Sequence, residues 1–215
     1  MPTSRLGCPG RWDAVVRGYP VKHYAPGCRI RHQGDADPHV HIVCAGITKL
    51  VHCWIDGRSS IIGLRCAPTL LGMESALSLI PPAVAVDAAT PCIVCRIPAR
   101  EFHSRVDGDL ELSHEVYAEL SREVGRHCDQ LAMLSTLSAR ERLRVCIQSL
   151  AQELAAASPG GEPVALPIRD WELAQLLSIT PQYMSRLLHE CEHEGFLRRE
   201  RGRWILANDF STVSV

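Results

Sequence analysis

A stripe of hydrogen-bonding side chains stands in the C-terminal third of the sequence, at spacings of three and four residues. It consists of Gln182, Ser185, Arg186 and His189. Such spacing places side chains on one face of an α-helix. In the major groove of DNA, an arginine guanidinium can donate two hydrogen bonds to guanine, and a glutamine amide can pair with adenine. The stripe therefore predicts a helix that reads base pairs.

The neighbouring sequence supplies elements that would position this helix. Thr180 is a good N-cap, Pro181 suits the first helical position, and Gly195 can end the helix. An amphipathic helix is expected over Trp171–Leu177, and Phe196–Leu206 has the pattern of two short strands around a basic turn. The interpretation is a winged helix-turn-helix, the alternative being a helical hairpin with a solvated polar face. The expected DNA contacts are Thr180, Pro181, Gln182, Tyr183, Ser185, Arg186, His189, Arg201 and Arg203.

Two stretches of this region, Leu173–Leu177 and Thr180–Leu188, resemble the DNA-binding helices of the Crp/Fnr transcription regulators. The resemblance implies a sequence-specific regulator that binds a palindromic operator as a homodimer, with a TGA-like core in each half-site. One departure is Ser178, which stands in the turn where the family usually has glycine. If the backbone there is left-handed, serine costs about 1–2 kcal/mol.

The N-terminal half has short strand-like segments separated by turn signals such as Pro26-Gly27 and Asp56-Gly57. The expected strands are Val21–Tyr24, Cys28–His32, Val40–Ala45, Thr48–Ile55, Ser59–Arg65, Val84–Ala89 and Cys92–Ile97. This number of short strands predicts a β-sandwich or barrel. Their order resembles the β-roll sensor domain of the same family. A short helix is expected around Trp12–Arg17.

From Asp109 the apolar spacing becomes that of a coiled coil, over more than three heptads. The repeat runs through Leu110, Ser113, Tyr117, Leu120, Val124, His127, Leu131 and Leu134. Six of these, Tyr117, Leu120, Val124, His127, Leu131 and Leu134, are the predicted contacts of a parallel homodimer. The alternative is a long helix within one chain's own core. A second helix is expected over Ala139–Ala156.

The predicted fold class is therefore α+β, in three parts. An antiparallel β-roll sensor domain is expected over residues 19–108, a dimerisation helix over 109–137, and a winged helix-turn-helix domain over 138–215.

What the sensor domain binds is less apparent from the sequence. Cyclic-nucleotide-binding relatives carry a phosphate-binding arginine after a Gly-Glu pair. The matching residues here leave Gly72, Glu74 and Ser75 as effector-binding candidates, but there is no arginine between Cys66 and Arg96. Because a buried phosphate without a cationic partner is unfavourable, cyclic AMP is not the expected effector. A cation from outside this loop would restore binding of cyclic AMP, and the candidates are Arg58, Arg65, Arg122 and Arg126.

The sequence contains ten cysteines, which leaves metal or redox control open. The metal-ligand candidates are Cys8, Cys28, Cys92 and Cys95. An iron–sulfur cluster or a haem is a candidate cofactor, the haem ligands being drawn from Pro2 and the Cys and His residues. Each cysteine can equally be a small buried hydrophobe. The clustered N-terminal cysteines of iron–sulfur members of the family are missing from the sequence.

Composition narrows the remaining choices. The net charge is −1 over 215 residues, so any attraction to DNA must come from local clusters of arginine. No membrane span or signal pattern is present, which predicts a cytoplasmic protein with no membrane partner. Without a G-x-S-x-G, P-loop or H-E-x-x-H pattern, an enzyme is not expected. The expected partners are double-stranded DNA, a second copy of the chain and RNA polymerase. A metal- or redox-binding protein that acts through protein contacts is the alternative.

Overall fold

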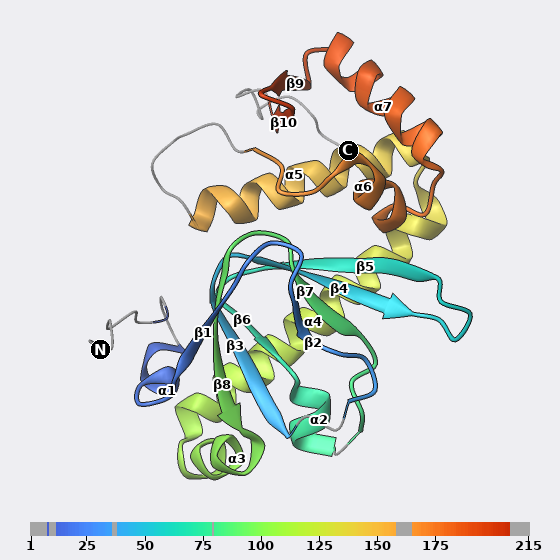
Figure 1. Cartoon of the computed structure of the whole chain (residues 1–215). Coiled ribbons are helices and arrows are strands. Elements are labelled where there is room, and N and C mark those ends of the chain that lie inside the picture. The colour runs from blue at the N-terminus through green and yellow to red at the C-terminus, as the bar shows by residue number, and fades with distance from the viewer. Residues whose placement is uncertain (1–7, 9–11, 36–37, 79, 158–164, 207–215) are drawn as a thin grey trace. The chain divides into compact units, whose positions relative to one another are not determined.

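The computed structural model describes residues 8, 12–35, 38–78, 80–157 and 165–206 (Figure 1). The chain divides into two compact units, Met1–Asp129 and Gln130–Val215. None of the described helices is long and apolar enough to cross a membrane. The boundaries predicted after residues 108 and 137, between the sensor domain, the dimerisation helix and the DNA-binding domain, remain a prediction.

Two antiparallel four-stranded sheets form the body of the first unit. Its strands are β1 (Val21–Tyr24), β2 (Arg29–Arg31), β3 (His39–Ala45), β4 (Ile47–Cys53), β5 (Ser59–Cys66), β6 (Thr69–Leu71), β7 (Ala85–Ala88) and β8 (Cys92–Pro98). One sheet has the order β1-β8-β3-β6 and the other the order β2-β7-β4-β5. The predicted antiparallel β-roll is confirmed, and β6 is a strand that the sequence patterns did not indicate.

The apolar residues of the strands explain which sheet positions are buried. β3 lies between β8 and β6 and is buried along nearly its whole length, whereas β5 alternates between buried and half-buried positions. Gly46, between β3 and β4, has a φ of 91°, and a Cβ there would overlap the carbonyl oxygen of Pro91. The two sheets can therefore meet closely at this corner only because the residue is glycine.

The helices described in the first unit are α1 (Asp13–Val16), α2 (Met73–Ser78) and α3 (Ala99–Gly108), together with most of α4 (Leu110–Thr136), whose last residues belong to the second unit. The short helix predicted near Trp12 is confirmed. Trp12 and Phe102 are fully buried and join a core cluster that also contains Val40 and Ile97 of β3 and β8. Neither α2 nor α3 was predicted, because α2 is only six residues long and α3 buries a single side chain, Phe102.

The long helix α4 has 27 residues, so its length is roughly 40 Å at 1.5 Å per residue. On one side, Leu112 and Val116 are buried in the core of the first unit. On another side, large apolar residues recur every seven positions and remain exposed: Leu110 (73%), Tyr117 (63%), Val124 (63%) and Leu131 (66%). We call these four residues the exposed heptad line. One face of α4 therefore packs in the core of the first unit, while the exposed heptad line on another face remains uncovered.

An ion cluster ties α4 to strand β5. Arg65 of β5 is buried, and its Nε donates a hydrogen bond of 2.8 Å to Glu123 of α4. Arg126 reaches both Glu119 and Glu123, at 3.0 and 2.8 Å, and Arg122 lies 2.9 Å from Glu119. Burial would raise the pKa of Glu123, but hydrogen bonds from Arg65 and Arg126 outweigh it and hold the pKa below its usual value. The cluster is thus held in its charged form.

In the second unit, the described residues after the end of α4 form three helices and one hairpin. These are α5 (Ala139–Ala157), α6 (Asp170–Leu176), α7 (Pro181–His193), β9 (Leu197–Glu200) and β10 (Arg203–Leu206). Its buried residues include Leu143 and Ile147 of α5, Leu173 of α6 and Leu187 of α7. The predicted order of helices and wing is confirmed.

Candidate DNA-binding face and effector site

The turn between α6 and α7 determines how α7 is presented. Ser178 has a φ of 55°, so the left-handed backbone considered from the sequence is present. Thr180 then caps α7, because its hydroxyl accepts a hydrogen bond of 3.3 Å from the backbone N–H of Tyr183. Pro181 occupies the first turn, where its missing N–H leaves no helical hydrogen bond unmade.

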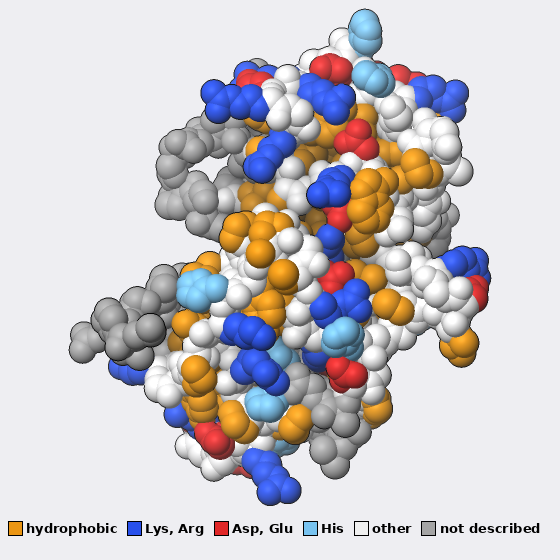
Figure 2. Space-filling view, in the orientation of Figure 1, with side chains coloured by type: hydrophobic (Ala, Val, Ile, Leu, Met, Phe, Trp, Pro, Cys, Tyr) orange, Lys and Arg blue, Asp and Glu red, His pale blue; other side chains and the backbone are white. Residues whose placement is uncertain are grey.

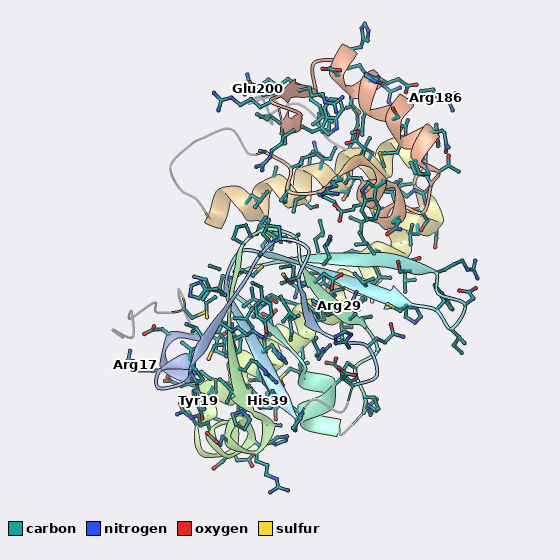
Figure 3. The ribbon with its side chains drawn as sticks, viewed as in Figure 1. Arg17, Tyr19, Arg29, His39, Arg186 and Glu200 are labelled. Carbon is teal, nitrogen blue, oxygen red and sulfur yellow. The ribbon has the colours of Figure 1, made fainter. Side chains whose placement is uncertain are left out.

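The two faces of α7 have opposite character. One face is buried and consists of Met184, Leu187, Leu188 and Cys191. The other carries the predicted stripe, and Gln182, Ser185, Arg186 and His189 are all exposed. The guanidinium of Arg186 lies 4.9 Å from the centre of the Tyr183 ring, which supports the long arginine side chain near the start of the helix. Arg186 is labelled beside α7 in Figure 3.

The far end of α7 is tied to α5. Glu194 forms ion pairs with Arg140 and, at 2.6 Å, with Arg144. The hydrogen bond from Arg140 holds the pKa of Glu194 below its usual value. Arg144 also lies 4.8 Å from the centre of the Phe196 ring, just after Gly195 ends the helix with a φ of 73°. Both ends of α7 are thus fixed by local contacts.

The hairpin β9–β10 presents the basic turn. Glu200 pairs with Arg203, so only Arg201 and Gly202 form the turn, with φ values of 47° and 79°. Two positive φ values are typical of the tight turns that join antiparallel strands. Arg201 and Arg203 are exposed, and Figure 2 shows basic side chains gathered over the hairpin and α7.

The hairpin is held against the start of α6 by a tryptophan. The Nε1 of Trp204 donates a hydrogen bond of 2.8 Å to Asp170, and the guanidinium of Arg199 lies 5.2 Å from the centre of the Trp204 ring. His189 contacts the same ring edge-on, with 6.4 Å between ring centres. Sequence patterns did not indicate this contact between the stripe and the hairpin.

In the first unit, the effector-binding candidates surround an arginine that the sequence interpretation did not consider. Gly72 has a φ of 91°, and Glu74 lies in the first turn of α2. The Nη2 of Arg31, from β2, donates a hydrogen bond of 2.6 Å to Glu74. The side chain of Ser75 lies outside what the structure describes. The expectation that the pocket region lacks a cation is therefore wrong: Arg31 reaches it from a distant strand.

Comparison with known proteins assigns both units. Residues 21–109 match the cyclic nucleotide-binding domain family, and residues 135–211 match the Crp-like helix-turn-helix domain family. This pairing is the architecture of the Crp/Fnr transcription regulators. The chain belongs to this family. Members of the Crp/Fnr family are transcription regulators, not enzymes.

Individual relatives agree with this assignment. The chain is 25% identical over 191 residues to a probable transcriptional activator of Rhizobium leguminosarum bv. viciae, covering 87% of this chain and 77% of the relative. It is 24% identical over 173 residues to the nitrogen fixation regulation protein FixK of Bradyrhizobium diazoefficiens, covering 80% of this chain and 72% of FixK. The structure of FixK2 from Bradyrhizobium japonicum has the same fold, with a TM-score of 0.74 and 19% identity, and covers 89% and 93% of the two chains.

The cysteines of this Crp/Fnr regulator do not form the site considered from the sequence. Cys28 is exposed, Cys92 is buried in a small cluster with Val43 and Val94, and Cys8 and Cys95 share a larger core cluster with Cys44. Burial raises the pKa of Cys95 to about 12. Among the described residues, which include all ten cysteines, no group of three or more His, Cys, Asp or Glu could hold a metal ion. The thiols present therefore do not fit an iron–sulfur cluster. Pro2, one of the haem ligands considered, lies outside the described residues.

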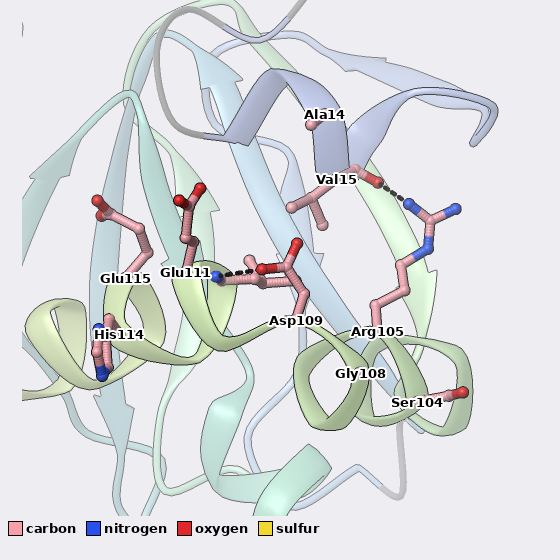
Figure 4. A pocket seen from close by; sticks show the side chains of 10 residues that line it. Ala14, Val15, Ser104, Arg105, Gly108, Asp109, Glu111, His114 and Glu115 are labelled. Atoms are coloured by element: carbon pink, nitrogen blue, oxygen red, sulfur yellow. Dashed lines mark hydrogen bonds between the residues drawn. The ribbon is translucent and has the colours of Figure 1, made fainter.

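An open hollow of about 710 Å³ lies between α1, α3 and the start of α4 (Figure 4). Two of its polar side chains are engaged in local structure. Asp109 accepts a hydrogen bond of 3.1 Å from the backbone N–H of Leu112, and Arg105 donates one of 3.4 Å to the carbonyl of Val15. None of the predicted DNA-binding, dimerisation or effector-binding residues lines this hollow.

Replacing Thr180 with alanine should destabilise the second unit by about 1 kcal/mol, because the N-cap of α7 loses its side-chain acceptor. Thermal unfolding followed by circular dichroism checks this. Thr180→Ser keeps a hydroxyl and should restore most of the stability. Equal stability of the alanine variant and the wild type would show that Thr180 does not cap the helix in solution.

Replacing Ser178 with glycine should have the opposite effect and stabilise the unit by about 0.5–1 kcal/mol, because glycine adopts a positive φ without steric cost. The matched control is Ser149→Gly on the exposed side of α5, which should destabilise by about 0.5 kcal/mol because glycine is a poor helix former. Chemical denaturation of the three proteins gives both values. Destabilisation by Ser178→Gly would contradict the left-handed turn.

Proposed function

We propose that this Crp/Fnr regulator binds an inverted-repeat operator as a parallel homodimer, with α7 in the major groove. The observation that carries the proposal is the exposed stripe of Gln182, Ser185 and Arg186 on a helix fixed at both ends. Arginine and glutamine provide the donors and acceptors that distinguish base pairs in that groove. Thr180, Pro181 and Tyr183 border the stripe, and together with His189, its fourth member, they supply further contacts with DNA.

The wing supplies a contact of another kind. Arg201 and Arg203 lie on the exposed turn and strand of the hairpin, where arginines neutralise backbone phosphates. Such contacts strengthen binding to all sequences alike and are weakened by salt. A net charge of −1 makes this local cluster the main source of electrostatic attraction.

The exposed heptad line supports the homodimer. A parallel partner helix would cover Tyr117, Val124 and Leu131, which are 63%, 63% and 66% exposed in one chain. Leu120 and Leu134 are half-buried and border the line, although Leu120 already packs on the core of the first unit. His127 is half-exposed and lies 3.6 Å from Glu123, so it would take a polar place in the interface.

The experiment is selection of binding sites from a pool of random DNA duplexes, followed by footprinting on the sequence obtained. We expect an inverted repeat whose half-sites lie one helical turn apart, about 10–10.5 base pairs between centres. Enrichment of a single unrepeated site, or of no sequence, would contradict the proposal.

We further propose that the regulator acts in the cytoplasm with RNA polymerase as a partner, and that its signal is not cyclic AMP. The cysteines do not support an iron–sulfur cluster, as described above. The arginines considered as outside cations are engaged elsewhere: Arg65, Arg122 and Arg126 belong to the ion cluster with Glu119 and Glu123. Arg58 is exposed and pairs with Asp56.

A further inference from the structure

Two arginines of the β-roll are buried, and they differ in how their guanidinium groups are satisfied. Arg65 donates hydrogen bonds from every nitrogen: Nε and Nη2 bind Glu123, and Nη1 donates to the carbonyl of Leu64 at 2.7 Å. Such a group is fully paired and has a structural role. Arg65 is therefore the reference for a buried arginine in this fold whose hydrogen bonds are all made within the chain.

Arg31 is buried as deeply, with 5% of its surface exposed, but it is only partly satisfied. Its Nη2 donates to Glu74 at 2.6 Å and, more weakly, to the carbonyl of Val84 at 3.4 Å. Its Nε and Nη1 have no hydrogen-bond partner among the described residues. A buried N–H of a charged group without an acceptor is unfavourable, so these two atoms call for an acceptor that the described residues do not supply.

The surroundings of Arg31 are arranged around Gly72. A Cβ at Gly72 would lie 3.1 Å from Nη1 of Arg31 and 3.6 Å from Nδ1 of His41, which is itself buried. Any side chain at this position would therefore crowd the guanidinium. Glycine therefore leaves room beside Nη1, which is itself a buried atom, where a larger residue would crowd it.

Glu74 is a removable counter-ion. Its side chain is 37% exposed while that of Arg31 is 4% exposed, so the carboxylate stands between the buried guanidinium and the solvent. It can turn into water, where a carboxylate is well solvated, whereas Arg31 cannot follow. The pair is thus neutral at rest but able to exchange one anion for another.

We propose that Arg31 anchors a binding site for a small oxyanion, carboxylate or phosphate in type, and that this anion is the signal that the β-roll receives. The oxyanion would accept hydrogen bonds from Nε and Nη1, and it would displace Glu74 from Nη2. Charge-assisted hydrogen bonds from arginine to such groups are among the strongest available in proteins. That the anion controls DNA binding rests on the proposed function; that it binds does not.

The test is calorimetric titration of the full-length protein, without DNA, with three probes: inorganic phosphate, succinate and cyclic AMP. We expect saturable binding of phosphate or succinate but not of cyclic AMP, together with a rise in melting temperature that increases with ligand concentration. The probe that saturates identifies the class, a phosphate or a carboxylate, and saturation by cyclic AMP alone would contradict the proposal. Saturation by none of the three, in wild type and in Glu74→Gln alike, would overturn the proposal.

Three variants assign the binding to this arginine. Arg31→Gln should weaken it by about tenfold or more, because a charged donor is lost. Glu74→Gln removes the competing carboxylate and should tighten anion binding. This variant therefore tests the site even if Arg31→Gln does not fold. Arg29→Gln is the matched control, since Arg29 lies on the same strand and pairs with Asp87 at the surface. It should bind as wild type does.

Two results would contradict the assignment: equal affinity in wild type, Arg31→Gln and Glu74→Gln, or equal weakening by Arg31→Gln and Arg29→Gln. Operator affinity is measured separately, with and without the saturating probe. Anion binding in a protein that selects no operator would overturn the proposed function and leave the site standing. Operator binding by a protein that binds none of the anions would overturn the anion site and leave the proposed function standing.

Discussion

A chain carrying both Val124→Glu and Leu131→Glu is expected to be monomeric and to bind operator at least about a hundredfold more weakly than wild type. Both residues belong to the exposed heptad line, and in a parallel dimer each glutamate would face its symmetry mate. Two half-site contacts made by one dimer reinforce each other by a factor of about 10²–10⁴, and a monomer loses this gain.

Light scattering at micromolar concentration gives the oligomeric state, and titration of labelled operator gives the affinity. The matched control is Ser121→Glu with Ala132→Glu, which adds the same charge at exposed positions of α4 outside the predicted seam. The control should remain dimeric. A wild-type protein that is monomeric at this concentration and still binds operator fully would refute the dimer.

The Arg186→Ala variant should lose about 1–3 kcal/mol of operator binding, or about 5- to 150-fold in affinity, and should relax preference at one base pair. The side chain is exposed near the start of α7 and is supported by Tyr183, so its guanidinium is available for a guanine. Removing it leaves the fold of the unit unchanged, because the buried face of α7 does not include it.

Arg201→Ala provides the contrast within the same unit. Its loss should weaken binding to every duplex by a similar factor and reduce the steepness of the salt dependence, as expected for a phosphate contact. Competition titrations over a panel of single-base operator variants, at two salt concentrations, separate the two outcomes. If Arg186→Ala keeps the affinity and selectivity of wild type, α7 is not the reading helix.

Much of the architecture could be predicted because local signals agree with the final fold. The cap at Thr180, the alternating apolar residues of the strands and the heptad spacing of α4 each depend on neighbours within a few residues. The turn at Ser178 was also recognised, because serine stands where the family usually has glycine, but the sequence did not decide whether its backbone is left-handed.

What escaped prediction depends on contacts between distant parts of the sequence. The helix α3 has few large apolar residues and is fixed by Phe102, whose burial is decided by β3 and β8. Arg31 meets Glu74 across 43 positions, so a search for cations within one loop missed it. The cysteines illustrate the converse: Cys92 and Cys95 are close in sequence, yet they are buried in different clusters of the core.

The ion cluster between β5 and α4 limits how this protein can change over evolutionary time. A mutation that removes Glu123 alone leaves the buried guanidinium of Arg65 without its counter-charge, and one that removes Arg65 alone takes away the link to the helix. Replacing both members of a buried ion pair with apolar residues is, in contrast, often tolerated. Positions 65 and 123 should therefore change together among descendants of this gene. If the two residues are replaced one after the other, the intermediate protein has only one member of the ion pair, and in it the β-roll is less firmly joined to α4.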